Sequence, residues 1–283
     1  MTPSPDTIPM PDRIAALKGI AKQIRAQIIE MIFKAQSGHP GGSLSATDIL
    51  AVLYFDQMRV DPKNPDWPDR DRFVLSKGHA CPVWYATLAL RGYFSIEELG
   101  TLRQLGSKLQ GHPVKGKCPG VDATAGSLGV GFGQAVGLAL DARLSGKDHK
   151  VYAVLGDGEI QEGIVWEAAN TAARHRLDNL IIVVDQNGLQ NDGFCKDIMA
   201  VGDTEQKFRA FGWQTARVNG HRIEELLPAL EMARASKGQP YCIVAETIKG
   251  KGVSFMENVR AWHGKPPSAE QRAQALKEIQ EAL

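Results

Sequence analysis

The chain has 283 residues, with 33 basic and 32 acidic side chains, a net charge of +1 and no long tract of like charge. This length can bury a large core, and the balanced charge argues against nucleic acid or an anionic membrane surface as a partner. No apolar run approaches the roughly 20 residues that span a bilayer, and no signal peptide is evident. The four cysteines are scattered, as in proteins of a reducing compartment. We therefore expect a cytoplasmic protein without membrane contact.

The amino-terminal half is expected to begin with a loose arm, residues 1–11, ahead of one α/β domain over residues 12–283. Helical spacing of apolar residues and turn signals predict, in chain order, a helix at 14–33, a helix at 44–55 behind Ser43, a strand at 72–76 and a helix at 82–90. Ser95 is expected to cap a short helix, with Glu98 as its capping-box partner. A long loop at 106–133, rich in Gly, Pro and Lys, follows.

The carboxyl-terminal half is expected to alternate strands with helices. The pattern predicts a helix at 134–144, strands at 151–155 and 180–185 around a helix at 165–174, a polar loop at 188–203, a strand at 213–218, a helix at 222–235, a strand at 241–247 and a helix at 268–283. A strand–helix–strand order implies a parallel pair with a right-handed crossover. The predicted fold class is α/β, a doubly wound, mostly parallel sheet with helices on both faces.

Polar residues follow both central strands of this predicted sheet. The segment Gly156–Glu159 (Gly-Asp-Gly-Glu) ends one strand and begins a helix, and Asn187 follows the next strand. N–H groups at a helix start favour phosphate, and Mg²⁺ prefers carboxylate, carbonyl and phosphate oxygens. Asp and Gly are also ordinary turn formers, but the paired strand ends favour a magnesium-diphosphate site. Neither the dinucleotide-binding glycine pattern nor a P-loop is present.

Four of the seven histidines adjoin a glycine at predicted loops or strand ends: His39, His79, His112 and His263. A lone loop histidine is usually solvated, but four in this setting favour a shared pocket. There, imidazoles can bind phosphate, hold sugar hydroxyls or transfer protons near neutral pH. The remaining three are interpreted as structural or surface residues: His149, His175 and His221. No His or Cys spacing fits a zinc site.

The segment 124–133 carries four of the chain's glycines within eight residues. It is either a flexible loop or a backbone that approaches a planar ligand closely, with Leu128 packed on that ligand. Three glutamates fall at the start of the helix after the Gly-Asp-Gly turn: Glu159, Glu162 and Glu167. If exposed they favour the helix dipole, whereas a buried Glu162 would be a proton-linked interface residue; spacing leaves both interpretations open.

With these motifs in hand, the chain resembles the N-terminal half of a transketolase, a thiamine-diphosphate enzyme, over residues 14–263. The motifs occur in the family's order: SGHPGGSLS (37–45), LSKGHA (75–80), GHP (111–113), TAGSLGVGFG (124–133), GDGEIQEG (156–163) and DQNGLQNDG (185–193). The GDG…N pair alone belongs to all thiamine-diphosphate enzymes, and the full set is specific for transketolases.

The resemblance implies roles for individual residues. Mg²⁺, or Ca²⁺ or Mn²⁺ in its place, would be held by Asp157, Asn187 and the carbonyl of Leu189. The donor sugar and its proton transfers would involve His39, His112 and His263. Thiamine diphosphate would contact His79, Gly126, Ser127, Leu128, Gly156, Gly158, Glu159, Asn187 and His263. Ser127 departs from the Gly-Pro-Leu that the family commonly has at 126–128.

The resemblance also implies a partner, a separate C-terminal subunit that carries the family's pyrimidine-binding domain in an α2β2 heterotetramer. Together the subunits would transfer a two-carbon glycolaldehyde unit from a ketose phosphate to an aldose phosphate, as in the pentose phosphate pathway. Pentose phosphates and a specialised branched or sulfonated sugar both stay open as substrates. One alternative is the α-subunit of a 2-oxoacid dehydrogenase first component, but a 2-oxoacid needs no such set of histidines. The other alternative is a non-catalytic cofactor-binding subunit.

Overall fold

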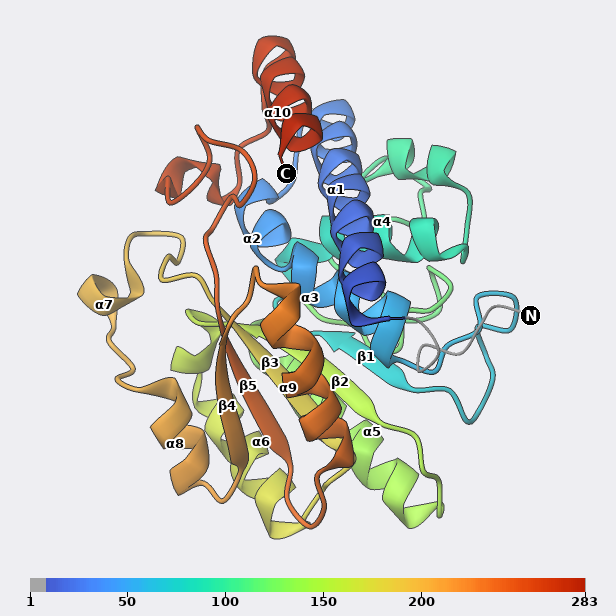
Figure 1. The fold of residues 1–283 in the computed structure, drawn as a ribbon, viewed down its shortest axis with the longest axis vertical. Helices are drawn as coiled ribbons and strands as arrows, with labels where there is room; N and C mark the ends of the chain where they lie inside the picture. The colour runs from blue at the N-terminus through green and yellow to red at the C-terminus, as the bar shows by residue number, and fades with distance from the viewer. Residues whose placement is uncertain (1–8, 283) are drawn as a thin grey trace.

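One parallel sheet organises the part of the chain that the computed structural model describes, residues 9–282. Its five strands run in the order β1-β2-β3-β5-β4 (Figure 1). Their bounds are β1 Arg72–Leu75, β2 Val151–Gly156, β3 Leu180–Gln186, β4 Gln214–Asn219 and β5 Tyr241–Glu246. Every neighbouring pair is parallel, which requires a crossover between strands, and helices supply the crossovers. The predicted α/β fold with a mostly parallel sheet is confirmed.

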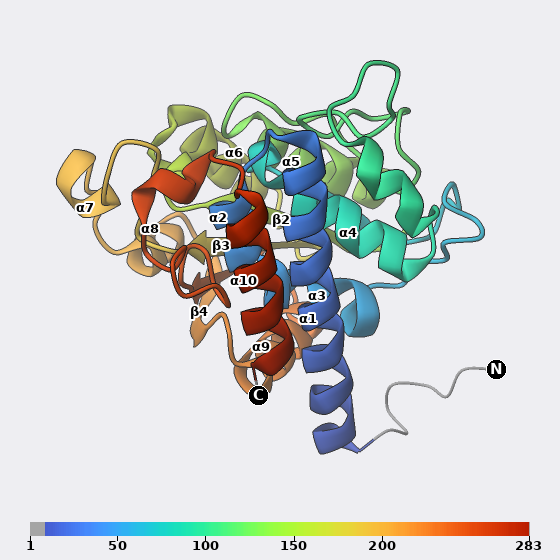
Figure 2. The same cartoon turned by 90° about the horizontal axis from the view of Figure 1, so that it is seen from above.

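Helices cover both faces of the sheet (Figures 1 and 2). The α-helices are α1 Met10–Ala35, α2 Pro40–Ser45, α3 Thr47–Val52, α4 Cys81–Arg91, α5 Val130–Leu144, α6 Gly163–Arg174, α7 Cys195–Ile198, α8 Thr204–Ala210, α9 Ile223–Ala235 and α10 Ala269–Glu281. A π-helical turn, Leu53–Gln57, continues α3, and short 3-10 turns span Gly78–Ala80, Ile96–Thr101, Glu159–Gln161 and Arg260–His263. None of the helices in residues 9–282 has both the length and the apolar character needed to cross a membrane.

Alternation along each strand creates two hydrophobic cores, because successive side chains point to opposite faces of a sheet. On β3, Ile181 and Val183 face a core shared with α1, α3, α4, α9 and α10, whereas Ile182 and Val184 face a second core shared with α5, α6 and α8. The four cysteines are all buried and form no disulfide, as the sequence predicts for small core residues. Sheet and cores together form a rigid support for the loops at the strand ends.

The amino-terminal predictions need correction at three places. Of the predicted arm, residues 1–8 lie outside the described residues, and positions 10 and 11 already belong to α1. The second helix begins at Pro40 rather than behind Ser43, because proline suits a first helical position, where its missing N–H is not needed. Ser95 does cap a helical turn, but its hydroxyl accepts from the N–H of Glu97, so the capping box with Glu98 is wrong.

The carboxyl-terminal elements differ from the prediction mainly in length. Helix α5 begins at Val130, four residues before the predicted start, because Gly129 takes a left-handed φ of 79° and sets the turn into the helix. Two short helices, α7 and α8, lie where the pattern predicts loop or the approach to a strand. Asp203 caps α8 by accepting from the N–H of Gln206 at 3.1 Å. The helix has seven residues, which is too short for a pattern of apolar residues to predict it.

Truncation in the central strand tests the second core. Ile182 on β3 is fully buried, so Ile182→Ala removes three buried carbons and leaves a cavity. We expect a loss of about 3 kcal/mol in the free energy of unfolding, measured by urea denaturation. Leu144→Ala, at a position that is 79% exposed on α5, is the control and should change stability by less than about 0.5 kcal/mol. Equal stabilities for the two variants would contradict the burial of this face.

Candidate functional site

A recess of about 380 Å³ opens at the carboxyl ends of β1, β2, β3 and β5, the edge at which parallel α/β sheets bind ligands. Most predicted site residues line it: His39, His79, Gly126, Leu128, Gly156, Asp157, Gly158, Glu159, Asn187, Leu189 and His263. Two residues that sequence analysis did not single out, Lys77 and Lys249, also line it. The recess therefore combines acidic, amide, imidazole and ammonium groups.

Asp157 and Asn187 meet at the ends of adjacent strands, as predicted. Asp157 is 5% exposed, and its carboxylate accepts from the N–H groups of Gly158 at 2.9 Å and Gly188 at 2.5 Å. The amide oxygen of Asn187 accepts from the N–H of Leu189 at 3.1 Å. Burial, together with the nearby carboxylate of Asp185, raises the pKa of Asp157 to about 6. A cation beside Asp157 would reverse this shift because it stabilises the ionised carboxylate.

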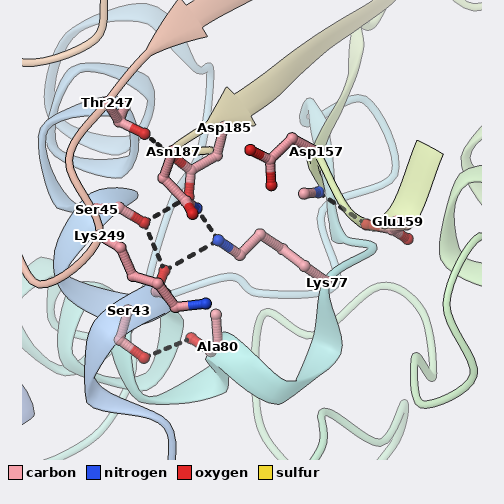
Figure 3. Close-up of polar contacts among 12 residues, drawn as sticks. Ser43, Ser45, Lys77, Ala80, Asp157, Glu159, Asp185, Asn187, Thr247 and Lys249 are labelled. Carbon is pink, nitrogen blue, oxygen red and sulfur yellow. Dashed lines mark hydrogen bonds and ion pairs between the residues drawn. The ribbon is translucent and has the colours of Figure 1, made fainter. Parts of the chain in front are cut away.

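A buried ion pair between Lys77 and Asp185 lies beside this carboxylate (Figure 3). The ammonium of Lys77 is 2.5 Å from the carboxylate of Asp185 and donates to the carbonyl of Gly42 at 3.1 Å. Asp185 also accepts from the hydroxyl of Ser45 at 2.6 Å and from the hydroxyl of Thr247. Burial alone would raise the pKa of Asp185, but the Lys77 ammonium and the hydroxyls of Ser45 and Thr247 together hold that pKa below its usual value. Asp185 is therefore a charged anchor for β1, α2 and the segment after β5.

A second ammonium, that of Lys249, points into the recess from the segment after β5. It is 2% exposed, donates to the carbonyl of Leu189 at 2.9 Å and lies 2.7 Å from Nδ1 of His263. Burial and the neighbouring Lys77 lower the pKa of Lys249 to about 8. Figure 3 shows the ammonium groups of Lys77 and Lys249 on the same side of Asp157 and Asn187. Two cations so close together create a positive potential suited to a polyanion.

Three of the predicted histidines form one cluster. The ring centroids of His39, His79 and His263 lie 5.3 to 5.5 Å from one another. Burial, with nearby cations, lowers the pKa of His39 to about 4 and that of His263 to about 3, and it lowers the pKa of His79 well below its usual value. All three imidazoles are therefore neutral near pH 7.

The neighbours of two histidines decide which ring nitrogen carries the proton. Nδ1 of His263 faces the Lys249 ammonium, and Nδ1 of His39 lies 3.4 Å from a guanidinium nitrogen of Arg103. Both partners can only donate, so each Nδ1 must accept and each Nε2 must carry the proton. His39 and His263 are therefore hydrogen-bond donors at Nε2.

Two of the predicted residues do not line the recess. His112 is an exposed residue beside Arg103, close enough to His39 to contribute to the lowering of its pKa. Ser127 is exposed on the loop between Gly126 and Leu128, and both of those neighbours do line the recess. His112 and Ser127 thus sit at its rim, where a larger ligand or another chain can reach them.

The glutamates after the Gly-Asp-Gly turn separate into two kinds. Glu159 is buried, and its carboxylate accepts from the N–H groups of Gly129 at 2.8 Å and Gly156 at 2.9 Å and from the hydroxyl of Ser76. It therefore ties the glycine-rich loop to the turn after β2, and its contacts are with the protein. Glu162 and Glu167 are exposed in this chain.

The lysines that sequence analysis missed follow strands in the same way as the predicted residues. Lys77 comes two residues after β1, and Lys249 three residues after β5. The rule that identified Asp157 and Asn187, a polar side chain at the carboxyl end of a parallel strand, identifies both lysines when it is applied to every strand. Arg103 follows no strand, so this rule does not identify it. It reaches His39 from a loop in which its own backbone takes a left-handed φ of 59°.

These groups suit a diphosphate with one divalent cation. Among residues 9–282, no three His, Cys, Asp or Glu side chains gather as a metal centre, so a cation here depends on one carboxylate, neutral oxygens and the ligand's own phosphates. Mg²⁺ is bound in this way in phosphate sites. Glycine at 42 keeps the recess open, because a Cβ there would lie 3.3 Å from Nζ of Lys77 and 3.7 Å from Nε2 of His79.

A parallel sheet that brings an acid, an amide and two lysines to one edge defines a diphosphate-binding α/β domain. Comparison with known proteins makes this specific. The family model for the transketolase thiamine diphosphate binding domain matches residues 17–280, and the chain belongs to the transketolase family.

Named relatives and a solved structure agree with this assignment. The chain is 45% identical to the 6-deoxy-6-sulfo-D-fructose transketolase subunit SqwG of Clostridium sp. over 92% of this chain and 94% of that one. It is 38% identical to one of the subunits of an apulose-4-phosphate transketolase from Phocaeicola vulgatus, over 96% of each chain. The transketolase structure from Campylobacter jejuni superposes with a TM-score of 0.90 at 38% identity, over 94% of this chain and 43% of that one.

Removal of one partner from the buried ion pair tests its role. Asp185→Asn leaves the Lys77 ammonium buried without a counter-charge, and we expect a loss of about 3 kcal/mol in unfolding free energy by chemical denaturation. Glu224→Gln breaks the exposed pair with Lys18 and should cost less than about 0.5 kcal/mol. A small effect at Asp185 would show that solvent reaches Lys77.

Proposed function

We propose that this chain is the diphosphate-binding subunit of a split transketolase that works with a separate C-terminal subunit. The two-carbon ketol unit would pass from a ketose phosphate, or from a sulfonated ketose, to an aldose phosphate. The observation that carries the proposal is the meeting of Asp157, Asn187, two lysines and three neutral histidines in one recess. The split arrangement is supported by relatives that are themselves called subunits, 94% and 96% of whose lengths this chain covers. In contrast, the chain covers 43% of the transketolase of Mus musculus.

Within this proposal, Mg²⁺ is held by Asp157, Asn187 and the carbonyl of Leu189, and Ca²⁺ or Mn²⁺ can substitute because they also prefer oxygen ligands. The diphosphate is bound by the charges of Lys77 and Lys249 and by the N–H of Gly158. That N–H donates to Asp157 at 2.9 Å in this structure, so the diphosphate would share or replace this bond. The carbonyl of Leu189 accepts from Lys249 in this structure, so cation and ammonium compete for it. Metal binding would release the Lys249 ammonium for the diphosphate.

The chain's own residues bind and orient in this reaction. Bound thiamine diphosphate supplies the carbon nucleophile and the electron sink for ketol transfer. Gly126 and Leu128 line its ring, and the Nε2–H groups of His39 and His263 donate to the hydroxyls of the sugar. Since both imidazoles are neutral donors near pH 7, they position oxygen atoms and stabilise negative charge that develops on them. His112 approaches the sugar from the rim.

Substrate, assembly and location are further parts of the proposal. Two relatives are named for 6-deoxy-6-sulfo-D-fructose and for apulose 4-phosphate, which favours a specialised ketose over the pentose phosphates. An α2β2 assembly with the C-terminal subunit would place a pyrimidine-binding domain over the exposed rim at Ser127. Four buried cysteines without a disulfide fit a reducing compartment, so we place the enzyme in the cytoplasm.

Reconstitution tests the function. The chain is co-purified with the C-terminal subunit, and the complex is supplied with thiamine diphosphate and Mg²⁺. We expect it to transfer a ketol unit from 6-deoxy-6-sulfo-D-fructose, apulose 4-phosphate or xylulose 5-phosphate to an aldose phosphate. Product formation is measured by mass spectrometry, and neither polypeptide by itself should turn over. Turnover of pyruvate with an electron acceptor would instead establish a 2-oxoacid dehydrogenase component, and a complex without Mg²⁺-dependent cofactor binding would be non-catalytic.

The raised pKa of Asp157 predicts how metal binding depends on pH. A protonated carboxyl is a poor cation ligand, so Mg²⁺ affinity should fall about tenfold for each pH unit below about 6, the pKa of Asp157. We expect the rise in melting temperature that Mg²⁺ with thiamine diphosphate produces at pH 7.5 to be smaller at pH 5, where the affinity is about tenfold lower. Asp157→Ala should abolish it at both pH values. An Mg²⁺ effect that survives in this variant would place the cation elsewhere.

A further inference from the structure

A chain of buried polar groups links helix α1 to the segment that carries Lys249. Arg25 on α1 binds the carboxylate of Asp48 on α3 through two contacts, of 3.0 and 2.5 Å. The same carboxylate lies 2.8 Å from Nδ1 of His221, and Nε2 of His221 accepts from the N–H of Ile248 at 2.8 Å. Four segments that are distant in sequence are thus connected through one carboxylate and one imidazole.

The contacts of His221 leave it only one protonation form. A backbone N–H can only donate, so Nε2 must be the acceptor and Nδ1 must carry the proton, which it donates to Asp48. Asp48 is 6% exposed; burial alone would raise its pKa, but Arg25 and His221 hold that pKa at about 2. An ionised carboxylate therefore fixes both the orientation and the tautomer of the imidazole, as second-shell carboxylates do for metal-bound histidines.

Backbone bonds anchor the segment around Lys249 at both ends: the N–H of Thr247 donates to the carbonyl of Gln186 at 3.1 Å, and the N–H of Gly250 donates to the carbonyl of Gly41 at 3.0 Å. Between these anchors, the N–H of Ile248 depends on His221. Gly250 and Gly252 take left-handed φ values of 81° and 92°, so the backbone turns sharply on both sides of Lys251. The Arg25 guanidinium holds the backbone between these two glycines, because its Nε donates to the carbonyl of Lys251 at 3.2 Å. On the other side of Gly250, His221 holds the backbone at Ile248, the residue immediately before Lys249.

We propose that His221 is a positioning residue that, by holding the N–H of Ile248, directs the Lys249 side chain into the cofactor recess. The inference rests on the proposed function, since it makes cofactor affinity depend on a residue that lines no part of that recess. His221 contacts neither the sugar nor the cofactor in this arrangement. It acts through Lys249, whose ammonium reaches Leu189 and His263.

Two substitutions at His221 separate its two hydrogen bonds. In His221→Gln the side-chain amide reaches the position of Nε2 and keeps an acceptor for Ile248. In His221→Asn the shorter side chain reaches only the position of Nδ1, so the bond to Asp48 is kept and the bond to Ile248 is lost. We expect His221→Asn to weaken thiamine diphosphate binding about tenfold, the lower end of what second-shell changes cost, and His221→Gln to stay within about twofold.

The measurement is the dissociation constant of thiamine diphosphate at saturating Mg²⁺, by calorimetry on the complex with the C-terminal subunit, well below the melting temperature. His149→Asn is the matched control, because His149 is 4% exposed but precedes β2 at the opposite edge of the sheet. It should lower the melting temperature and leave the dissociation constant unchanged. If it weakens binding as much as His221→Asn does, a general loss of stability explains both results and the inference fails.

A double-mutant cycle tests the route through Lys249. Lys249→Met should itself weaken binding, and His221→Asn added to it should bring no further loss, because the group that His221 directs is gone. An undiminished tenfold loss on the Lys249→Met background would overturn the inference. Should His221→Asn not fold, Arg25→Lys, which loses the bond to Lys251, replaces it and should give a smaller loss that also vanishes on that background.

The outcomes for this inference and for the proposed function are distinct. If the parent complex binds thiamine diphosphate and His221→Asn binds it equally well, only the positioning role of His221 is wrong. If the parent complex does not bind thiamine diphosphate, the proposed function itself is wrong.

Discussion

The buried pair of Lys77 and Asp185 is the contact on which the site depends. Lys77 is 1% exposed and Asp185 is fully buried, and removal of each charge from water costs several kcal/mol. That cost is offset only where the remaining hydrogen-bonding capacity is filled, and the hydroxyls of Ser45 and Thr247 and the carbonyl of Gly42 fill it here. These hydrogen bonds to the ion pair hold α2 and the segment after β5 against the sheet.

The same pair sets the electrostatic balance of the recess above it. Asp185 disfavours ionisation of Asp157, and Lys77 disfavours the charged forms of His79 and Lys249. The carboxyl groups of Asp157 and Asp185 and the amino groups of Lys77 and Lys249 therefore perturb one another. A divalent cation beside Asp157 would offset the repulsion between the two carboxylates, and a polyanion would offset the repulsion between the two ammonium groups. Metal and diphosphate would therefore favour each other's binding.

The sequence predicts the fold well because its strands are long apolar runs that alternate with helices, and the order of these elements allows few topologies. Asp157, Asn187 and the histidines at 39, 79 and 263 were predictable because each stands beside glycine at a strand end or turn. Lys77 and Lys249 follow the same rule, but lysine is common on surfaces and its burial here comes from tertiary packing. The contact of His221 with Asp48 joins residues 173 positions apart in sequence, and no local pattern contains it.

The packing of the first helix against the last one has a consequence for synthesis (Figure 2). Glu30 on α1 pairs with Arg272 on α10, 242 residues later, and Ala275 and Ile279 of α10 complete the core that α1 begins. A ribosome adding about 5 to 20 residues per second leaves an interval of about 10 to 50 s between the two. During that interval α3 and α4 can already cover part of the apolar face of α1, but the strip that packs on α10 has no final partner. That strip of the nascent chain stays exposed until α10 emerges.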